Sequence, residues 1–586
     1  MTGWQAGALR NRWLSRWTWR DLLLWAWTAL LTVLLLGPSL GSGFTLSYDM
    51  VFVPRQSLLP EFLGLQGGLP RAVPQDAVVA AATTVIDGAW LQHLVLLAIP
   101  ILAGLGVARL VSVAGLGAQL ISVSLAIWNP FVIERLVQGH WALLLAYALM
   151  PWAIATSIRI RRTGHGWIAL IWLCAGGSLV PSGGILLALV SIPIACWPPR
   201  VGWARGLAGA AAVVSVNLPW ILPALLHPNV AAGDPVGAEV FSLRSEGPWG
   251  PWVTALGGGG LWNTEVVPAS RGTVLALVLT LVVLGAAALG WGAVRERFGI
   301  ASLGWLTCLA AAGFLAAGIS ATWVGPWTWI VDSVPGGGLA RDSQKLLAPL
   351  VMLLAILAGP GVTRVGRRIA DRSTRAVLLA ACAIVPVALI PDGVWGVQGR
   401  LSAVDYPAQW SQMREAFASD PRSGDVVVLP WSNFRRFDFN ANRTILDPAP
   451  RWLPRSSIAS DTLAVARNGQ IEHITGDDPR SAVVGAALAQ GRPLAEIMGA
   501  IGARFVLLEE GQRPEPDAGI LRGLEPAGTA GDLVWWTLPE GESIDSYEPS
   551  AAAALILTVD AAIILGLLAT AGVAVQRRIR RGHAPG

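Results

Sequence analysis

The chain has 586 residues, of which 54% are hydrophobic and only 13% are charged, whereas an ordinary soluble domain is about a quarter charged. With a mean hydropathy of +0.56, the chain has too much apolar surface for a water-soluble fold, which excludes a soluble globular protein. The net charge is +5, but the arginines stand in short runs between apolar stretches. This pattern is typical of cytoplasmic loops of membrane proteins and not of a nucleic-acid-binding surface.

Residues 1–20 are rich in arginine and tryptophan, which indicates a cytoplasmic segment lying at the membrane interface. The apolar run 22–36 that follows could belong to a signal peptide. However, residues 37–39, Gly-Pro-Ser, are not a cleavage site of the A-x-A type, and further apolar stretches follow. We therefore expect an uncleaved first span.

Roughly twelve stretches are apolar over about the 20 residues that a membrane-spanning helix needs. They predict an all-α polytopic membrane protein, with eleven helices in residues 21–391 and a final helix and basic cytoplasmic tail in 551–586. The stretches are 21–39, 92–110, 112–128, 141–158, 167–181, 183–198, 207–227, 273–293, 300–320, 346–362, 376–391 and 551–574.

The arginine runs give an independent test of this topology. If residue 1 is cytoplasmic and every stretch crosses the membrane, the dense runs outside the long polar segment all fall on one side. They include 159–162, 295–297, 364–375 and 577–581. Agreement with the positive-inside rule predicts a multi-pass protein of the plasma membrane with both termini in the cytoplasm.

The long polar segment, residues 392–550, then falls on the outer face. Its patterning predicts an extracytoplasmic α/β domain, with helices near 406–417 and 482–502. Buried-type strands are expected at 425–430, 504–508 and 533–537. The four cysteines lie in apolar stretches without ligand-like spacing, so they predict no metal site.

The first external loop, 41–91, contains Asp49 shortly after the first span. A carboxylate there, partly shielded from water by Tyr48 and its aromatic neighbours, could act as a general base toward a hydroxyl group. A loop aspartate is more often a cap or turn residue, so both interpretations stand. Asp76 and Asp87 follow in the same loop as substitutes.

Arg341 and the chain's only lysine, Lys345, are four residues apart where an apolar helix is expected to begin. On a helix they would share a face and, with the free amides of its first turn, form a phosphate site at the height of the lipid headgroups. The alternative is that both side chains only reach to the interface from an apolar surface.

Two further external segments carry candidate substrate-binding residues. Glu134, Arg135 and His140 could bind a sugar or a phosphate, although a Glu-Arg pair beside a capping histidine is equally good structure. A later loop offers Arg244 with Trp262 and Asn263. Its tryptophans could stack on sugar rings or serve as interface anchors.

Together these segments resemble the GT-C superfamily of integral membrane glycosyltransferases, and more distantly the membrane halves of mycobacterial arabinofuranosyl- and mannosyltransferases. The likeness rests on the acidic residue of the first external loop, Asp49, on the many spans with extended external loops, and on the C-terminal external domain. It also rests on the segment from Asn129-Pro-Phe to Gly-His140-Trp, which is similar to actinobacterial members.

The resemblance implies a hexosyl- or pentosyltransferase whose donor is a polyprenyl-phosphate-linked sugar and whose acceptor is a cell-envelope glycan or glycolipid. Asp49 would then accept the acceptor's proton, and Arg341 and Lys345 would hold the phosphate that leaves. Many members carry a pair of acids in the first loop where this chain has Asp49 alone, which leaves the use of a divalent metal open.

Two other functions fit the sequence. A lipid or glycolipid transporter or flippase would need polar groups at mid-depth in the membrane, and Asp560 in the last span would then be central. A non-catalytic envelope-assembly protein would use its external domain to dock partners. A transferase predicts instead a lateral cavity at the outer interface, lined by Asp49 and Arg341.

Overall fold

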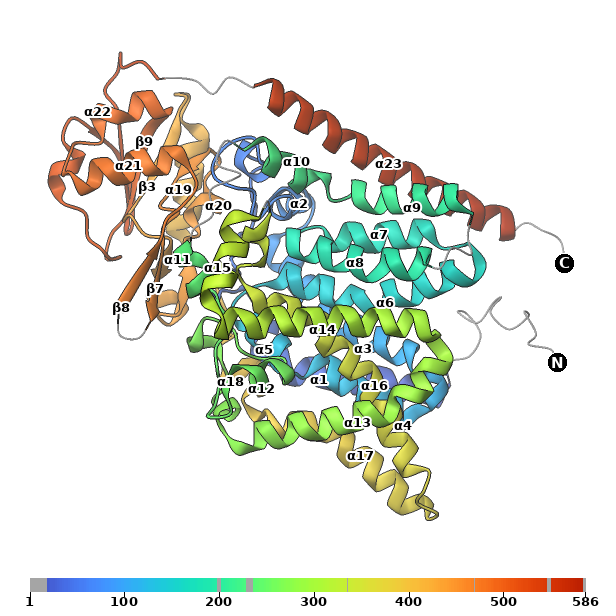
Figure 1. Ribbon diagram of the computed structural model, residues 1–586. Helices are drawn as coiled ribbons and strands as arrows, with labels where there is room; N and C mark the ends of the chain where they lie inside the picture. The colour runs from blue at the N-terminus through green and yellow to red at the C-terminus, as the bar shows by residue number, and fades with distance from the viewer. Residues whose placement is uncertain are drawn as a thin grey trace.

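The computed structural model describes residues 18–197, 202–227, 235–334, 336–467, 470–544 and 550–582. Most of the interfacial segment expected at residues 1–20 therefore lies outside the described residues. Figure 1 shows a bundle of long helices with a smaller, strand-containing region at one of its ends. The fold is thus mostly helical, with the sheet confined to the C-terminal part of the chain.

Nine helices of the described residues are long and apolar enough to cross a membrane, with the consecutive helices α4 and α5 counted as one. This makes the chain a multi-pass membrane protein. The helices are α1 (Trp19–Leu36), α3 (Gly88–Leu110), α4 (Leu116–Ile127), α5 (Pro130–Val137), α6 (Trp141–Thr163), α13 (Val274–Phe298), α14 (Ile300–Thr322), α16 (Ala348–Gly366), α17 (Arg372–Leu389) and α23 (Ala551–Gly582).

Three of the twelve expected spans are shorter or bent. Helix α7 (Trp167–Gly177) has 11 residues, about 17 Å at 1.5 Å per residue, which is short of a hydrocarbon core of about 30 Å. Helix α8 (Pro181–Cys196) has 16 residues. Helices α9 (Trp203–Ser215) and α10 (Leu218–Leu226) meet at 64°. The expected count of about twelve is not confirmed: the described residues contain nine spans, or ten if the bent pair is one.

The C-terminal region is built on a five-stranded mixed sheet in the order β10-β11-β9-β3-β6, in which β3 runs parallel to β9 and β6. The central strands β3 and β9 bury Val426, Val428 and Leu507 completely. Strands β3, β9 and β11 lie where the sequence predicts strands. The five strands are β3 (Asp425–Leu429), β6 (Ser457–Ile458), β9 (Ala503–Glu509), β10 (Glu525–Ala530) and β11 (Leu533–Thr537).

Three two-stranded pairs and several short helices complete this region and the loops between the long helices. The pairs are β1 (Phe44–Thr45) with β2 (Ala403–Val404), β4 (Phe434–Arg436) with β5 (Thr444–Leu446), and β7 (Leu463–Arg467) with β8 (Gln470–Ile474). The helices are α2 (Gln75–Ala82), α11 (Pro235–Val240), α12 (Gly250–Leu256), α15 (Val324–Ser333), α18 (Val394–Gln398), α19 (Ala408–Ser419), α20 (Ala449–Trp452), α21 (Pro479–Ala489) and α22 (Ala495–Met498).

The sheet region is joined to the loop that follows α1 by backbone hydrogen bonds. Strand β1 of that loop pairs with β2, with Phe44 opposite Val404, and Tyr48 forms a parallel bridge with Ile445 of β5. The guanidinium of Arg451 lies 3.0 Å from the Asp76 carboxylate of the same loop. Residues 392–550 are therefore not a detached module, because the first loop is part of their structure.

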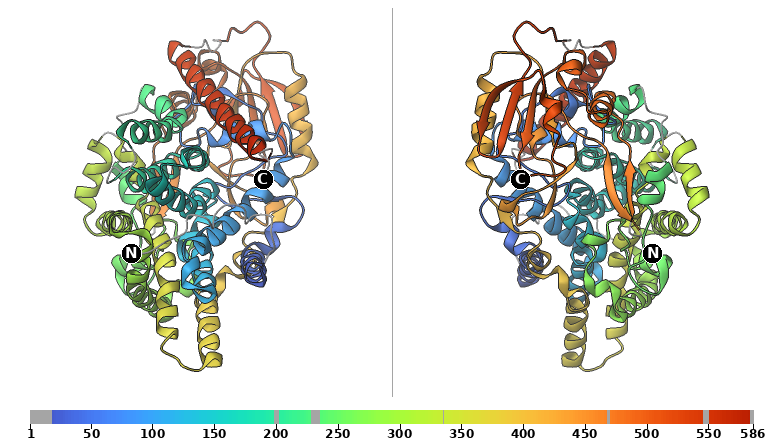
Figure 2. Two further views of the ribbon diagram at one scale, coloured as in Figure 1. Left: turned by 90° about the vertical axis from the view of Figure 1, so that its right-hand side faces the viewer. Right: turned by 90° about the vertical axis from the view of Figure 1, so that its left-hand side faces the viewer.

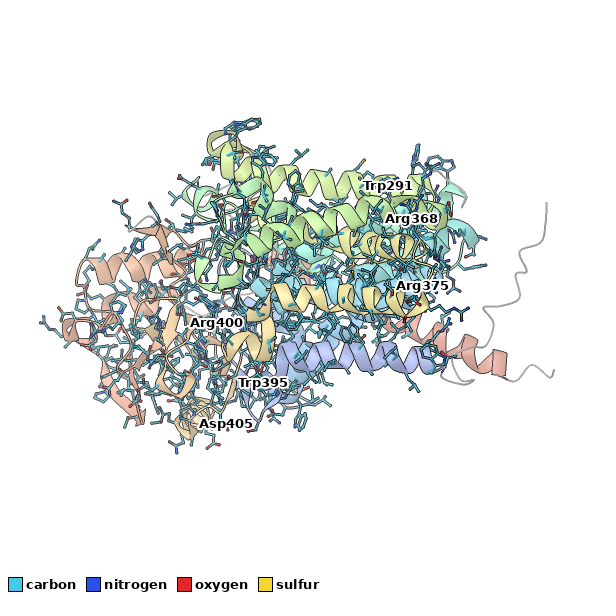
Figure 3. All side chains as sticks on the ribbon, turned by 90° about the horizontal axis from the view of Figure 1, so that it is seen from below. Trp291, Arg368, Arg375, Trp395, Arg400 and Asp405 are labelled. Atoms are coloured by element: carbon cyan, nitrogen blue, oxygen red, sulfur yellow. The ribbon has the colours of Figure 1, made fainter. Side chains whose placement is uncertain are left out.

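The two ends of the helix bundle differ in charge. Figure 3 shows Arg368 and Arg375 at one end, and Arg400 and Asp405 toward the other end, where the sheet region lies. The end of α16 and the start of α17 form an arm that leaves the body of the bundle (Figure 2). The arginine run 364–375 is thus at the opposite end from the sheet, as the expected topology requires.

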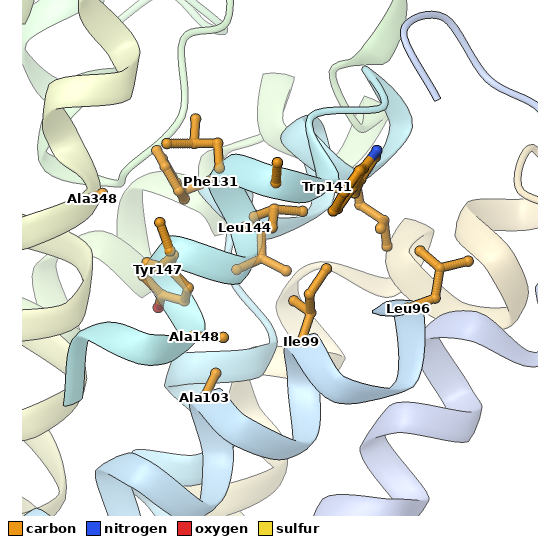
Figure 4. Close-up of a cluster of buried hydrophobic side chains, with 14 of the residues drawn as sticks. Leu96, Ile99, Ala103, Phe131, Trp141, Leu144, Tyr147, Ala148 and Ala348 are labelled. Atoms are coloured by element: carbon orange, nitrogen blue, oxygen red, sulfur yellow. The ribbon is translucent and has the colours of Figure 1, made fainter. Parts of the chain in front are cut away.

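The centre of the bundle is a close-packed apolar cluster. Figure 4 shows side chains of α3, α5, α6 and α16 meeting there, among them Ile99, Phe131, Leu144 and Tyr147. Each of these four is at most 2% exposed. Packing of this density holds the end of α5 and the start of α6 in place, and both elements carry the polar residues described next.

Candidate functional site

The Asp49 loop lies on the C-terminal end of α5. Leu46, Met50 and Val53 have no exposed surface and anchor the loop on both sides of Asp49. The Asp49 amide donates to the Gln138 carbonyl at 3.1 Å. Gly139 has a φ of +86°, and a Cβ there would lie 2.2 Å from the Met50 nitrogen. Only glycine permits both this turn and this approach, so the backbone fixes Asp49 beside α5.

The Asp49 carboxylate is held by His140, which precedes the first residue of α6. His140 Nε2 lies 2.9 Å from Asp49 Oδ2, and His140 Nδ1 lies 2.8 Å from Arg135 Nη1. An arginine can only donate, so the lone pair on Nδ1 must accept, and the ring proton stands on Nε2. His140 therefore donates to Asp49 as a neutral imidazole and orients its carboxylate.

Arg135 continues the chain of contacts into the protein. Its guanidinium donates two hydrogen bonds to Asp342, at 2.6 Å and 2.7 Å, and its Nε donates to Gln344 at 2.7 Å. Lys345 Nζ lies 3.5 Å from the same Asp342 carboxylate. The bidentate geometry makes this a strong, directional pair. A continuous polar relay thus runs from Asp49 through His140, Arg135 and Asp342 to Lys345.

The relay is exposed at its two ends and buried in the middle. The side chains of Asp49 and Lys345 are 37% and 27% exposed, whereas those of Arg135 and Asp342 are 0% and 7% exposed. A buried charge pair is stable only when each charge is compensated, as it is here. The two exposed groups, one anionic and one cationic, are the ones that a substrate can reach.

The pKa values of the groups outside the spans follow from this arrangement. Burial lowers the pKa of His140 below its usual range, and the positive charges of Arg135 and Lys345 act in the same direction, against the hydrogen bond with Asp49. Burial alone would raise the pKa of Asp342, but Arg135 and Lys345 together hold it well below its usual range. At neutral pH His140 is neutral and Asp342 is ionised.

A second buried cluster lies beside the relay. Gln344, which accepts from Arg135, donates to Glu134 at 3.2 Å, and Glu134 accepts the Leu261 amide at 3.1 Å. Glu246 accepts the neighbouring Gly260 amide and pairs with Arg271 at 2.8 Å. These contacts hold the glycine-rich turn at 257–260 against α5. This cluster therefore shapes the wall of the site from inside the protein.

The loop after that turn brings a further carboxylate to the Asp49 loop. Asn263 donates to Gln138 at 2.9 Å and accepts the Glu265 amide at 3.1 Å. The Tyr48 hydroxyl then donates to Glu265 at 2.5 Å. Burial, followed by this hydrogen bond, raises the pKa of Tyr48 to about 12. Tyr48 thus remains a protonated donor that links the two loops.

Tyr48 is also clamped by the sheet region. Its amide donates to the Thr444 carbonyl at 2.9 Å, and its carbonyl accepts the Leu446 amide at 2.8 Å. The Tyr48 φ of +43° is unusual for a residue other than glycine and costs on the order of 1 kcal/mol or more. The surrounding contacts must over-determine it, so strand β5 helps to set the position of Asp49.

Arg341 lies in a separate aromatic group. Its guanidinium lies 4.8 Å from the centroid of the Phe241 ring. The Trp262 ring packs edge to face on Phe241, with the two ring centroids 4.8 Å apart. Val465 and Ile474 of the β7–β8 hairpin pack on the same cluster. Arg244 is half-buried near the glycine-rich turn, its amide bonded to Gly260. Sheet-region side chains therefore reach the Arg341 loop.

The structure brings together four of the side chains that the sequence singles out: Asp49, His140, Arg135 and Lys345. Substrate contact by Glu134 and Arg135 does not fit their burial, because both residues have 0% exposure and their partners lie inside the protein. Of the substitutes for Asp49, Asp76 pairs with Arg451, and Asp87 caps α3 by accepting the Ala89 amide at 2.8 Å. Asn263 uses its side chain to link Gln138 to the loop at Glu265.

The single helical face expected for Arg341 and Lys345 is wrong. Residues Gly337–Ala340 and Ser343–Leu347 form two 3₁₀ turns, and α16 begins only at Ala348. Three residues per 3₁₀ turn place Lys345 over Asp342 and not over Arg341. The sequence reasoning also missed Asp342, Gln344, Glu246 and Arg271. The only sequence signal for them is that acids and amides stand close to cations, as in the segments 244–246 and 341–345.

A cavity of about 40 Å³ lies close to this cluster, among α4, α13 and α16. Its walls include Trp128, Asn129, Arg271 and Val351, and neither Asp49 nor Arg341 lines it. It is far smaller than the roughly 300 Å³ of a ligand pocket. Within the described part of the chain, no three His, Cys, Asp or Glu side chains gather in a way that could hold a metal ion.

No protein-family model and no curated protein sequence matches the chain. Among solved structures, the chain is similar to the arabinofuranosyltransferase AftD from mycobacteria, with 16% identity and a TM-score of 0.52 over 89% of this chain. AftD is a member of the GT-C superfamily. The chain has the GT-C fold. The match spans 40% of AftD, so this chain covers less than half the length of that protein.

Weaker likenesses are to the oligosaccharyltransferase AglB from Archaeoglobus fulgidus. The complex of AglB with an inhibitory peptide and a dolichol-phosphate has 11% identity and a TM-score of 0.42, covering 85% of this chain and 70% of AglB. The apo form has 10% identity and the same TM-score, covering 91% and 76%. The fold resemblance predicted from the sequence is thus confirmed by AftD.

Proposed function

We propose that this GT-C chain is a membrane glycosyltransferase that moves a sugar from a polyprenyl-phosphate donor to a glycan or glycolipid acceptor of the cell envelope. In this proposal the termini are cytoplasmic, and residues 392–550 lie on the outer face of the plasma membrane. The observation that carries the proposal is the relay from Asp49 to Lys345. It presents a carboxylate and an ammonium group at the outer end of the helix bundle, joined by buried, fully compensated charges.

The chemistry requires one group that accepts a proton and one that stabilises a leaving phosphate. Asp49 takes the proton of the acceptor hydroxyl as its oxygen attacks the anomeric carbon. The bond between that carbon and the phosphate oxygen breaks, and its electron pair leaves with the lipid phosphate. Lys345, with Arg341 from the adjoining turn, binds the negative charge that develops there. General-base assistance of this kind contributes roughly 10²–10⁴ in rate, and fixed cations add electrostatic stabilisation.

His140 and Arg135 act as positioning residues. His140 donates to one oxygen of Asp49 and so orients the carboxylate, whose remaining lone pairs can accept the hydroxyl hydrogen. Arg135 fixes the tautomer of His140 and, through Asp342, the place of Lys345. One buried guanidinium thus sets the separation between the base and the phosphate-binding cation.

Transport has weaker support from the same structure. A transport path needs polar groups lining a route between helices at mid-depth. Asp560, the acid expected to be central to such a path, lies on α23, whose apolar window is only 11% buried. The relay and the hydrogen-bonded groups beside it lie instead in the loops near the sheet region.

The decisive experiment is the Asp49→Asn variant in reconstituted membranes with a polyprenyl-phosphate sugar. We expect transfer to fall about 10²–10⁴-fold, because the amide is nearly isosteric but cannot accept the proton. Expression and membrane insertion should match the wild type. Asp405→Asn is the matched control, since Asp405 is an exposed acid of the same outer region, and it should retain full activity. Full activity in Asp49→Asn would remove Asp49 from the mechanism.

A second experiment tests the phosphate-binding role. Replacing Lys345 and Arg341 together by glutamine should raise the KM for the lipid donor more than the KM for the acceptor. The reason is that each lost cation removes a charge-assisted contact to the phosphate, on the order of 1.5–3 kcal/mol. Equal increases for donor and acceptor would contradict the assignment and indicate damage to the fold.

A further inference from the structure

A cleft of about 450 Å³ opens on the sheet region, well away from Asp49 along the β3 strand. It lies at the start of the two parallel strands, lined by Asp425, the first residue of β3, and by Gly502, which precedes β9, and the first turn of α21 forms one wall. Gln66 of the first external loop closes one side. The volume of the cleft is within the range of roughly 300–1,000 Å³ that ligand pockets occupy.

The polar centre of the cleft is an ion pair between Asp425 and Arg480. The two groups are 2.8 Å apart, and their side chains are 21% and 16% exposed, so both can be reached from solvent. Asp478 caps α21 by accepting the Arg480 amide at 2.9 Å, and its carboxylate lies 3.5 Å from the Arg480 guanidinium. A carboxylate beside a guanidinium presents hydrogen-bond acceptors and donors side by side.

The surrounding charges select against an anionic ligand. Glu61 lies close enough for Asp425 to raise its pKa, although burial is the larger cause. Burial likewise raises the pKa of Asp425, against the effect of Arg480. Arg480 therefore stands among three carboxyl groups, those of Glu61, Asp425 and Asp478. A second cation, Arg504, lies beside the cleft and donates to the Ser423 carbonyl at 2.8 Å. Three carboxyl groups still outnumber these two cations, so a phosphate or carboxylate ligand is disfavoured, whereas neutral hydroxyl groups would find partners of both kinds.

The remaining wall of the cleft is apolar. Val483, which is 43% exposed, faces it together with Ile501 and Ile544. An apolar surface next to a pair of planar polar groups suits a ligand with one hydroxyl-rich edge and one C–H face. Sugar rings have this character, so the lining favours a neutral carbohydrate over a peptide or a lipid headgroup.

We propose that this cleft binds neutral glycan and that, given the glycosyltransferase function proposed above on which it rests, the glycan is the acceptor chain. Strand β3 has five residues, about 16 Å at 3.3 Å per residue, and its far end leads to the β4–β5 hairpin that hydrogen-bonds Tyr48. The cleft therefore engages sugars several units behind the hydroxyl that reacts at Asp49. It makes the enzyme prefer long acceptors.

The test uses the full chain in lipid nanodiscs with octasaccharides and disaccharides of arabinan, mannan and galactan as probes. Val483→Trp fills the cleft, and Arg480→Gln removes the cation of the ion pair. Both variants should weaken octasaccharide binding about tenfold, the loss expected when one hydrogen bond to a charged group goes. They should raise the ratio of octasaccharide KM to disaccharide KM by the same factor. Arg492→Gln is the matched control, because Arg492 pairs with Glu496 on the exposed surface of the same region.

Three results would overturn the inference. One is unaltered octasaccharide binding in Val483→Trp. The second is an equal rise in both KM values, which would indicate damage at the reacting end. The third is tighter binding of sugar phosphates than of neutral sugars. Binding is measured without turnover, so a wild-type protein that binds octasaccharide through the cleft but transfers no sugar would refute the proposed function and not the binding site.

Discussion

Two fully buried arginines flank the Asp49 loop, and they differ in where their contacts lead. Arg135 pairs with Asp342, and its contacts continue outward to Asp49 and Lys345, which are both exposed. Arg435 is the middle residue of β4 and pairs with Asp447 and Glu509, whose side chains are 3% and 1% exposed. The first cluster is open to solvent at both ends and the second is closed. Burial of an arginine alone therefore does not distinguish a functional network from a structural one.

The largest effect is expected when the arginine of each cluster is replaced. Arg135→Met and Arg435→Met should both lower the free energy of unfolding by about 3–5 kcal/mol, because each leaves buried acids uncompensated. Only Arg135→Met should also lower kcat per folded molecule. Thermal unfolding in nanodiscs together with sugar transfer, normalised to the folded fraction, separates the two effects. An equal loss of normalised activity in Arg435→Met would show that the closed cluster also serves the reaction.

His140→Gln sharpens the comparison within the open cluster. Glutamine can still donate to Asp49 but does not reproduce the ring that accepts from Arg135. Loss of a hydrogen bond to a charged group, about 1.5–3 kcal/mol, corresponds to roughly a 10–100-fold fall in kcat at about 1.4 kcal/mol per factor of ten. A kcat equal to that of the wild type would mean that His140 does not position Asp49.

The same residue determines a pH dependence. Burial lowers the pKa of His140, so the folded state binds this proton less readily than the unfolded state, whose value is about 6.5. Stability contributed by neutral His140 is therefore complete above pH 6.5 and falls as the pH drops below it. Protonation would also place two donors, His140 and Arg135, against each other. The pKa of His140 in the folded protein lies below the unperturbed value of about 6.5. Wild-type activity should therefore fall only when the pH is lowered beyond that value, and this acid limb should be missing in His140→Gln.

The smallest expected effect concerns the link between the loops. Tyr48→Phe keeps the ring that packs edge to face on Phe434 at 6.4 Å but loses the hydrogen bond to Glu265. Such a bond contributes about 0.5–1.5 kcal/mol, so kcat should fall by about tenfold or less. Burial and Glu265 raise the pKa of Tyr48 to about 12, so the difference from wild type should not vary between pH 6 and pH 9. A pH-dependent difference in that range would contradict the assignment of Tyr48 as a permanent donor.

The sequence predicts the membrane class and the fold, which the nine spans of the described residues and the likeness to AftD confirm, whereas a site at Asp49 and its basic counterparts stays a prediction. The sequence does not predict which side chains meet. Arg135 and Asp342 are 207 residues apart, and neither hydropathy nor local motifs report a pairing over that separation. Hydropathy also labels 129–140 as a polar link, whereas Pro130–Val137 is a helix. Asn129 caps it and Pro130 begins it, and its charged residues are satisfied by partners distant in sequence.

The excess of predicted spans has a local cause. The mean hydropathy of a stretch depends on its side chains and not on its backbone hydrogen bonds, so it does not show where a helix must end. Pro181 begins α8 only a few residues after α7 ends, and Asn217 with Pro219 separates α9 from α10. Proline lacks the amide that a continuous helix needs. Segments that look long enough to cross are therefore divided into short or bent helices.

The hydrogen bonds between Tyr48 and strand β5 have a consequence for biogenesis. Ile445, the bridge partner of Tyr48, is translated about 400 residues later, which at roughly 5–20 residues per second amounts to about 20–80 seconds. During that interval the loop bearing Asp49 lacks its clamp. A ribosome-bound or truncated chain would insert into the membrane without this contact, so the arrangement around Asp49 is complete only after strand β5 has been made and has paired with the loop. The order of synthesis therefore delays the final positioning of Asp49.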